Sequence, residues 1–225
     1  MNLVKLSSGD TAKKELVWEE VNGRKGYLVA KRLMDIIGAL CGLILLSPLF
    51  IIVSFLIKYE DRKGPVIFKQ IRVGKDGKEF YMYKFRSMVT DAEERLKDLL
   101  EHNEVSGAMF KMKEDPRVTK IGKFIRKTSI DELPQLINVL KGEMSLVGPR
   151  PPLSREVKEY TSYDKQRLLV TPGCTGLWQV TERNNVGFEE MVELDLEYIS
   201  KRGLMYDLKI ILKTIQVMIK SNGAS

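Results

Sequence analysis

The sequence predicts a helix-rich α/β fold of the mixed α+β kind, in which a small soluble domain with one β-hairpin is anchored by an N-terminal re-entrant membrane helix and amphipathic interfacial helices. Three observations predict it: a 22-residue stretch without charge, a turn cluster between two apolar runs, and helical periodicity in much of the remaining chain. With 225 residues, the chain has room for one domain and an appendage. We divide it into a polar arm over 1–30, a membrane helix over 31–63 and a soluble domain over 64–225.

The uncharged stretch runs from Ile36 to Ile57, in a chain of which 30% of the residues are charged. As a straight helix it would measure about 33 Å, close to the thickness of the hydrocarbon core of a bilayer. It begins too late and runs too long for a signal peptide, and no small-residue cleavage site follows it. We therefore predict that it enters a membrane; the alternative is a buried helix of a soluble core.

Ser47 and Pro48 lie in the middle of this stretch and predict a break in the helix. Proline removes a backbone donor and clashes with the preceding turn, and the pieces on either side, 36–46 and 49–57, are each too short to span a bilayer. The flanks hold equal numbers of Lys and Arg, whereas a spanning helix favours one side. Ser47 can also bond a carbonyl that the kink frees. These facts favour a re-entrant helix with both ends on one face of the membrane; a kinked spanning helix is the alternative.

Beyond the membrane segment, apolar runs on either side of a turn cluster at Gly74–Gly77 predict a β-hairpin over 64–88. Thr90 and Glu93 then have capping-box spacing, and apolar residues after them recur on one helical face. We therefore expect a helix to open there.

Three further helices are expected in the second half of the chain. The first runs from about Asp131 to Leu140 and stops at Gly142, since glycine favours the left-handed conformation that ends a helix. The others cover 188–199 and 204–220. The last has an apolar stripe on one face, which is typical both of a helix on a membrane surface and of one packed on a core.

The chain has 37 Lys and Arg against 30 Asp and Glu, a net charge of +7 with a pI near 9.2. Residues 64–86 hold six basic and two acidic side chains, and residues 111–127 hold seven and two. These stretches therefore carry +4 and +5, and the remainder carries −2. Such a concentration of positive charge predicts an anionic partner: nucleic acid, a lipid surface or a phosphorylated small molecule.

Cysteine and histidine content narrows the classes of site. Cys41 and Cys174 have neither metal-ligand nor disulfide-framework spacing. His102, the single histidine, lies in a polar run without a nucleophile motif, so we interpret it as a surface residue and not as part of a catalytic triad. The chain has no P-loop and no G-x-G-x-x-G motif, which leaves nucleotide binding by those folds unsupported.

The segment just before Pro134 is the richest in possible chemistry. Pro134 is tolerated only in the first turn of a helix, so Asp131 and Glu132 are expected at a helix N-terminus, where exposed amides and the dipole bind anions and keep a carboxylate ionised. Arg126 precedes the acidic pair and can bind a phosphate with two donors. The structural alternative is that Ser129 and Glu132 merely form a capping box.

A second arginine, Arg150, lies in the proline-braced loop Gly148–Pro152. Rigid loops that present an arginine suit phosphoryl-transfer sites, in which positioning and charge neutralisation supply most of the catalysis. The alternative is a plain turn between two elements, and Pro172–Gly176 is likewise a turn signal.

A series of short motifs occurs in fixed order along the chain. They are Lys31-Arg-x3-Asp35, Ser47-Pro48, Gly64-Pro65, Tyr83-Lys-Phe-Arg-Ser-Met88, Asp115-Pro-Arg-Val-Thr119, Ser129-Ile-Asp-Glu-Leu-Pro-Gln135, Asn138-Val-Leu-Lys-Gly142, Met144-Ser-Leu-Val-Gly-Pro-Arg-Pro151 and Pro172-Gly-Cys-Thr-Gly176. Together they resemble bacterial sugar transferases, the monotopic phosphoglycosyl transferases that load polyprenyl phosphate with a sugar phosphate. The resemblance runs from about Lys31 to the C-terminus, and with nothing large before it we expect the minimal catalytic form.

The chemistry that the resemblance implies falls on residues already singled out. Asp131 would be the nucleophile that attacks the β-phosphorus of a UDP-sugar, expels UMP and carries the phosphosugar until polyprenyl phosphate attacks it. Glu132 would help to bind Mg²⁺, which offsets charge on the diphosphate. The remaining implied roles are phosphate contacts for Arg126, Arg150, Lys84 and Arg86, and nucleotide or sugar contacts for Gln179 and Arg183.

The resemblance also implies a location and partners. The broken helix would hold the chain in the inner leaflet of the bacterial cytoplasmic membrane, with the catalytic domain on the cytoplasmic face. The reaction would be the first membrane step in assembling a surface glycan, such as an exopolysaccharide, capsule, O-antigen or glycoprotein glycan. The partners would be a UDP-sugar, polyprenyl phosphate and inner-leaflet lipid, without nucleic acid. The sugar and the oligomeric state, a homo-oligomer included, stay open.

One departure from the family pattern is Glu182, which stands where relatives usually have a glycine before Arg183. Two other interpretations of the whole chain remain. In the first it is a membrane-tethered basic module for nucleic acid or anionic lipid, since aromatic residues at 81, 83 and 85 alternate along one basic strand. In the second it is a scaffold whose acidic pair only caps a helix.

Overall fold

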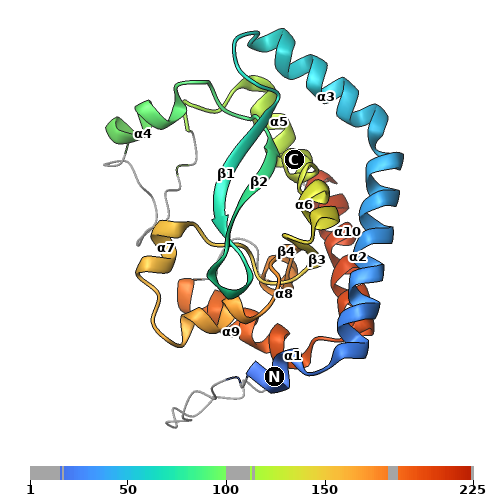
Figure 1. The fold of residues 1–225 in the computed structure, drawn as a ribbon. Coiled ribbons are helices and arrows are strands. Elements are labelled where there is room, and N and C mark those ends of the chain that lie inside the picture. Colours follow the sequence, from blue (N-terminus) through green and yellow to red (C-terminus); the bar gives the residue numbers. More distant parts are fainter. Residues whose placement is uncertain (1–15, 17, 100–111, 113–114, 182–186, 224–225) are drawn as a thin grey trace, which may run out of the picture.

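The computed structural model describes residue 16 and residues 18–99, 112, 115–181 and 187–223. A long broken helix runs along one side of the molecule and the β-hairpin lies across its middle (Figure 1). The elements are α1 (Trp18–Asn22), α2 (Lys25–Leu45), α3 (Ser47–Glu60), β1 (Ile67–Val73), β2 (Glu79–Phe85), α4 (Ala92–Leu99), α5 (Lys120–Lys127), α6 (Gln135–Lys141), β3 (Ser145–Val147), α7 (Ser154–Lys158), β4 (Gly173–Thr175), α8 (Leu177–Thr181), α9 (Phe188–Lys201) and α10 (Leu204–Gly223), with 3₁₀ turns at Lys75–Gly77, Ile130–Glu132 and Asp164–Leu169. This is the helix-rich mixed fold that the sequence predicts.

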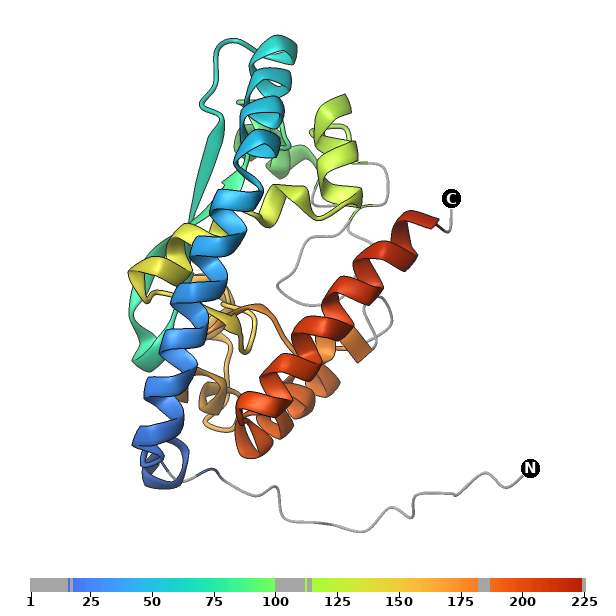
Figure 2. The same ribbon diagram turned by 90° about the vertical axis from the view of Figure 1, so that its right-hand side faces the viewer.

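The uncharged stretch forms α2 and α3, which are bent by 60° at Leu46 (Figure 2). Pro48 occupies the first turn of α3, where its missing N–H breaks no helical hydrogen bond. The hydroxyl of Ser47 donates to the carbonyl of Ile44 at 2.8 Å, so the predicted break and back-bond are both present. Among the described residues, no single helix has the length and apolar character needed to cross a bilayer, but the bent pair together has the composition of a broken span or a re-entrant loop.

Helix α2 turns a polar face inward. Lys31 Nζ forms an ion pair with Asp207 of α10 at 3.1 Å, and Asp35 accepts hydrogen bonds from the Ser145 hydroxyl at 3.0 Å and the Leu146 N–H at 2.9 Å. The opposite face exposes apolar side chains, with exposed fractions of 62% for Val29, 56% for Leu33 and 61% for Ile37. A helix on the surface of a water-soluble domain normally has the reverse arrangement, so the outer face of α2 suits an apolar medium.

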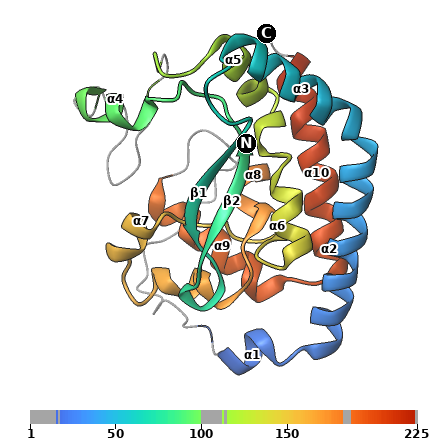
Figure 3. The same cartoon turned by 45° about the horizontal axis from the view of Figure 1, so that its top comes forward.

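The predicted hairpin is present, with β1 and β2 paired antiparallel around the turn at Lys75–Gly77. Asn138 of α6 is fully buried and closes the outer edge of β2. Its side chain accepts from the N–H of Tyr83 at 3.0 Å and donates to the carbonyl of Tyr81 at 2.7 Å. The hairpin therefore lies alongside α6, with α2 and α10 beyond it (Figure 3).

A second pair of strands, β3 and β4, is parallel and was not expected from the sequence, because three residues in each strand are too few to show a period. The chain comes very close to itself here, since a Cβ on Gly173 would lie 2.0 Å from the N atom of Gly148. A hydrophobic cluster that includes Val147, Tyr198 and Ile210 packs α9 and α10 against these strands.

Helices α4, α9 and α10 match their predictions to within a few residues, but the helix expected from Asp131 begins instead at Gln135. Ile130–Glu132 form a separate 3₁₀ turn, and Pro134 has no N–H with which to continue its hydrogen bonding. The predicted end at Gly142 is correct, with φ at 82°. Much of the predicted arm is also helical, since α1 and the start of α2 lie within 18–30, whereas residues 1–15 are outside the described residues.

Candidate active site

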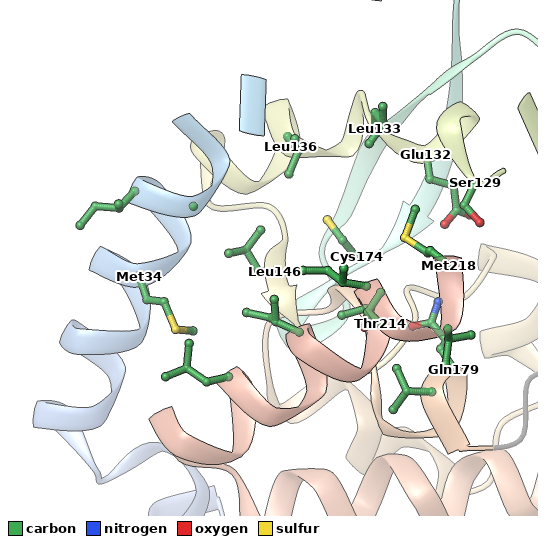
Figure 4. Close-up of a pocket in the computed structure, with 18 residues that line it drawn as sticks. Met34, Ser129, Glu132, Leu133, Leu136, Leu146, Cys174, Gln179, Thr214 and Met218 are labelled. Carbon is green, nitrogen blue, oxygen red and sulfur yellow. Dashed lines mark hydrogen bonds between the residues drawn. The ribbon is translucent and has the colours of Figure 1, made fainter. Parts of the chain in front are cut away.

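An apolar cavity of about 570 Å³ lies between α2, α6 and α10 (Figure 4). Met34 lies at one end, and Ser129, Glu132 and Gln179 lie at the other. The walls between them are mainly aliphatic: Ile37, Leu133, Leu136, Leu146, Leu208, Ile211 and Ile215. The apolar stripe predicted on the last helix therefore lines a cavity, which suits an apolar chain with a polar end.

A narrow polar pocket adjoins this cavity. Its charged side chains are Arg72 of β1, Lys84 of β2, Glu132 of the 3₁₀ turn before α6 and Arg150 of the loop after β3. Glu132, Cys174 and Gln179 line both spaces, so the polar pocket and the apolar cavity meet at these residues. Three cations against one carboxylate give the polar pocket a preference for anions.

The acidic pair lies on the turn between α5 and α6, which contacts β2. Glu132 forms an ion pair with Lys84, with Nζ and Oε1 2.7 Å apart. Asp131 lies behind it and is only 8% exposed. The contact with β2 therefore brings both carboxylates beside a cation of the hairpin.

Burial raises the pKa of Asp131 to about 6, against the lowering effects of Lys84 and Arg126 and with a further rise from Glu132. The expected cause of ionisation, a helix N-terminus, is absent because the turn is not the first turn of α6. Burial dominates and raises the pKa, although the side chain is still mostly ionised at neutral pH. The capping-box alternative is also wrong: Ser129 has a left-handed backbone, with φ at 57°, and its side chain makes no capping hydrogen bond.

The loop that carries Arg150 is fixed from one side by hydrogen bonds to three successive carbonyls. Arg167 Nη2 donates to the carbonyl of Arg150 at 3.4 Å, Arg72 Nη1 to that of Pro151 at 3.1 Å, and the N–H of Val73 to that of Pro152 at 2.9 Å. The loop is therefore more than a turn between elements, because its backbone is held in place while the Arg150 side chain reaches the pocket.

A buried ion pair supports this loop from behind. Arg167 and Asp195 of α9 are 3% and 0% exposed, and Arg167 Nη2 lies 2.7 Å from Asp195 Oδ2. Arg167 also donates to the hydroxyl of Tyr160 at 2.7 Å. Neither Arg167 nor Asp195 lines the pocket, and Oδ1 of Asp195 is buried without a hydrogen-bond partner among the described residues.

Four of the predicted site residues meet in the polar pocket: Lys84, Glu132, Arg150 and Gln179. Arg126 is exposed at the end of α5 and lies near enough to lower the pKa of Asp131. Arg86 is elsewhere: it is buried and donates to the Asp61 carboxylate at 2.8 Å and the Asp61 carbonyl at 2.7 Å, which ties down the link after α3. Arg183, Glu182 and His102 lie outside the described residues.

The sequence did not predict that Arg72 lines the polar pocket or that Cys174 lines both the pocket and the apolar cavity. Burial, together with the charge of Arg150, lowers the pKa of Arg72 to about 10, so Arg72 stays protonated at neutral pH. The available signal was its place in the basic stretch 64–86. Burial raises the pKa of the Cys174 thiol, which therefore lines the pocket as a neutral group. Gln179 Oε1 is buried without a hydrogen-bond partner among the described residues, which leaves an acceptor for a ligand.

The described residues contain no group of three or more His, Cys, Asp or Glu placed to hold a metal ion. Asp131 and Glu132 do supply adjacent carboxylates, and Mg²⁺ is commonly held by one or two carboxylates together with substrate phosphates. The donor set therefore fits a magnesium ion that binds together with a diphosphate.

Known proteins resemble this chain over most of its length. A family model described as bacterial sugar transferase matches residues 26–221. The chain is 54% identical over 201 residues to the galactosyl transferase CpsE of Streptococcus agalactiae, covering 88% of this chain and 44% of that protein. It is 46% identical over 198 residues to the undecaprenyl-phosphate galactose phosphotransferase of Salmonella typhimurium, covering 86% and 41%. Against the exopolysaccharide production protein ExoY of Rhizobium meliloti it is 40% identical over 200 residues, covering 87% and 88%. The chain therefore spans less than half of the first two relatives and most of the third.

Proposed function

The chain belongs to the bacterial sugar transferase family, and on that premise we propose that it transfers a sugar 1-phosphate from a UDP-sugar to polyprenyl phosphate and releases UMP. One observation carries the proposal: a pocket with three cations meets an apolar cavity at Glu132. The cations of the first suit the charge of a diphosphate, and the second suits the chain of a lipid phosphate. Two relatives are named as a galactosyl transferase and an undecaprenyl-phosphate galactose phosphotransferase, which supports this pairing of substrates.

In the first step, Asp131 attacks the β-phosphorus of the UDP-sugar. A bond forms between a carboxylate oxygen and phosphorus, the bridging bond to the α-phosphate breaks, and UMP leaves with the electron pair. Because the pKa of Asp131 is about 6, the side chain is mostly a carboxylate at neutral pH and is able to attack. Arg72, Lys84 and Arg150 offset the negative charge of the diphosphate while the bond breaks.

In the second step, an oxygen of polyprenyl phosphate attacks the phosphorus of the aspartyl phosphosugar. The bond between Asp131 and phosphorus breaks, the carboxylate is regenerated, and a polyprenyl-diphosphate sugar leaves. The apolar cavity holds the first part of the lipid chain, with the lipid phosphate at its polar end beside Glu132 and Gln179. Asp131 is the residue before Glu132 in the same turn. Gln179 offers its unpaired oxygen to a hydroxyl or N–H of the donor substrate.

Magnesium fits this site through Glu132, with Asp131 as its neighbour. When bound, Mg²⁺ offsets charge on the diphosphate and helps to orient it. Lys84 holds the Glu132 carboxylate in place through the 2.7 Å ion pair and so fixes the position of the metal ligand.

We also propose that α2 and α3 enter the inner leaflet as a re-entrant pair, with the catalytic domain on the cytoplasmic face. The inverted α2, which buries Lys31 and exposes Val29 and Leu33, supports this placement. Helix α3 continues the apolar surface through Ile51 and Phe55, which are 70% and 68% exposed. A surface of this size and character is stable only against lipid or a partner.

Because the product is a polyprenyl-diphosphate sugar, we place the reaction at the first membrane step in the assembly of a bacterial surface glycan. ExoY is named as an exopolysaccharide production protein, which supports an exopolysaccharide or a capsule as the polymer. The comparisons give no support to a non-catalytic module for nucleic acid. The sugar itself is to be determined with a panel of UDP-sugars, with UDP-galactose first because two relatives are named for galactose.

The proposal is tested by incubating the detergent-purified chain with Mg²⁺ and UDP-sugars that carry a labelled β-phosphate, without acceptor. We expect release of UMP and retention of label on the denatured protein. Asp131→Asn is expected to abolish both, because the amide is a poor nucleophile. Asp91→Asn serves as the control, since the Asp91 side chain is 42% exposed and forms an ion pair with Arg95 of α4, outside both pockets; it is expected to leave both signals intact.

Label retention by Asp131→Asn would contradict the assigned nucleophile. A requirement for polyprenyl phosphate before any UMP appears would contradict the covalent intermediate and favour direct transfer.

A further inference from the structure

The N-terminal ends of α2 and α10 come together at one end of the molecule (Figure 2). Residues from both helices line a basic hollow there. Its volume is about 670 Å³, and it shares no lining residue with the two pockets of the candidate active site. Four cations line it, namely Arg24, Lys201, Arg202 and Lys209. The other lining residues are tyrosines, glycines and apolar side chains, without a carboxylate.

Two guanidinium groups converge in this hollow on the ring of Tyr27. The Cζ atoms of Arg24 and Arg202 lie 5.3 Å and 5.6 Å from the ring centroid. Arg202 is only 4% exposed and donates to the carbonyl of Val21, while Arg24 donates to the carbonyl of Arg202 at 3.0 Å. Burial and, to a smaller extent, the charge of Arg24 lower the pKa of Arg202, whereas Asp207 raises it and so offsets part of the charge of this cluster.

The countercharge for this cluster is incomplete. Lys201 pairs with Glu197 at 2.9 Å, but in the part of the chain that the structure describes no carboxylate forms an ion pair with Arg24, Arg202 or Lys209. Asp207, buried below, is already paired with Lys31. Cations held close without an anion are unfavourable, and an anionic ligand removes that cost.

The surroundings of the hollow identify the kind of anion. Leu204 and Met205 lie on its wall, and Met205 is 69% exposed. Beyond it the outer face of α2 continues with Val29 and Leu33, and α10 continues with Leu208, which is 42% exposed. The cations therefore lie at the edge of an apolar surface, which is the position that a headgroup phosphate occupies relative to its acyl chains.

We infer that this hollow binds the phosphate of an anionic phospholipid, such as phosphatidylglycerol, with Arg24, Arg202 and Lys209 as its ligands. The bound headgroup joins the starts of α2 and α10 at the membrane surface. This site goes beyond the proposed function, since it requires contact with a membrane but no transfer reaction.

The experiment measures lipid adducts on the full chain by native mass spectrometry after release from nanodiscs of equal phosphatidylglycerol and phosphatidylcholine. The test variant is Arg24→Gln with Lys209→Gln. The matched control is Lys25→Gln with Lys213→Gln, which removes the same charge from the same two helices at exposed positions outside the hollow. We expect the wild type and the control to retain phosphatidylglycerol. In the test variant, the ratio of phosphatidylglycerol to phosphatidylcholine adducts is expected to fall about fivefold for each cation removed.

Equal losses in the two double variants would overturn the site and leave only diffuse attraction to the membrane. Absence of any preference for phosphatidylglycerol in the wild type would also overturn it. Soluble glycerol 3-phosphate is added in a separate arm, and displacement of the lipid by it at millimolar concentration would replace the lipid site with a soluble-anion site. Lys209→Gln alone, compared with Lys213→Gln, repeats the test if the double variant fails to fold.

Discussion

Charge is buried in two regions of this molecule under opposite conditions. Where α2 meets α10, Lys31 and Asp207 are 7% and 0% exposed, and the carboxylate also accepts from the hydroxyls of Tyr27 and Tyr198 at 2.9 Å and 2.7 Å. Lys31 and Asp207 therefore offset each other's charge within the fold. This pair has no need of a ligand, in contrast to the cations of the neighbouring hollow, and its role is to hold two helices together.

The polar pocket differs in both respects. Its cations, Arg72, Lys84 and Arg150, outnumber the single carboxylate that lines it, and the nearby Asp131 has a pKa raised to about 6. The positive charge of the pocket therefore exceeds the negative charge of its lining, and the excess is available to an anionic ligand. Asp131 is a buried acid near this pocket with a raised pKa. In this comparison, the charged pair whose partners lie within the fold has a structural role. The pocket whose cations outnumber its carboxylates is the candidate for function.

Replacing Lys31 with Met removes one partner of the buried ion pair between α2 and α10, and it has the largest expected effect on the free energy of unfolding. Removing one partner leaves Asp207 buried without a cation, which lowers the free energy of unfolding by about 3–5 kcal/mol. Lys25→Met is the control, because Lys25 is exposed at the start of the same helix. Chemical denaturation in detergent micelles measures the difference.

Adding Asp207→Asn to Lys31→Met is expected to recover part of this loss, because the amide carries no charge. Its oxygen still accepts from one tyrosine hydroxyl, and its NH2 group donates to the oxygen of the other. Equal unfolding free energies for Lys31→Met and Lys25→Met would show that the buried pair contributes nothing.

The sequence predicted the parts of the fold that depend on local pattern. The uncharged stretch, the break at Pro48, the hairpin and the helix end at Gly142 each depend on a few neighbouring residues. The inward polar face of α2 was not predicted, because the partners of Lys31 and Asp35 lie more than a hundred residues away. The strands β3 and β4 were missed for the same reason, since neither is recognisable without the other.

The candidate site divides in the same way. Motifs located Glu132, Lys84 and Arg150, which do meet in one pocket. The raised pKa of Asp131 was not predicted, because burial, which depends on the whole fold, outweighs the local helix argument. Arg86 follows β2 only two residues after Lys84, yet it binds Asp61, and only the path of the chain after α3 decides this.

Asp131→Asn tests whether the buried carboxylate beside the polar pocket destabilises the fold. Folding raises the pKa of Asp131 from 3.8 to about 6, so the carboxylate is less stable in the folded chain than in the unfolded one. This destabilisation is absent below pH 3.8, grows as the pH rises to 6 and is complete above it. We therefore expect the asparagine variant to be more stable by up to about 3 kcal/mol at neutral pH, while we expect it to lose activity.

Denaturation of both proteins at neutral pH and near pH 4 measures this gain, which is expected to shrink as the pH falls. The opposite sign, with Asp131→Asn less stable at neutral pH, would mean that the carboxylate is satisfied in the fold like Asp207, and the contrast between the two regions would fail.

Lys84→Met gives the smallest expected effect and separates two roles of one cation. Lys84 lowers the pKa of Asp131, so its removal is expected to raise that pKa above 6 by about one unit, equivalent to about 1.4 kcal/mol. Below this pKa the nucleophile is protonated, and the single-turnover rate of UMP release falls about tenfold for each pH unit.

A lysine that only contacts the substrate phosphate would lower the rate equally at every pH. A lysine that also tunes Asp131 moves the acid limb of the profile to higher pH, and Lys78→Met, at an exposed position before β2, is expected to leave that limb in place.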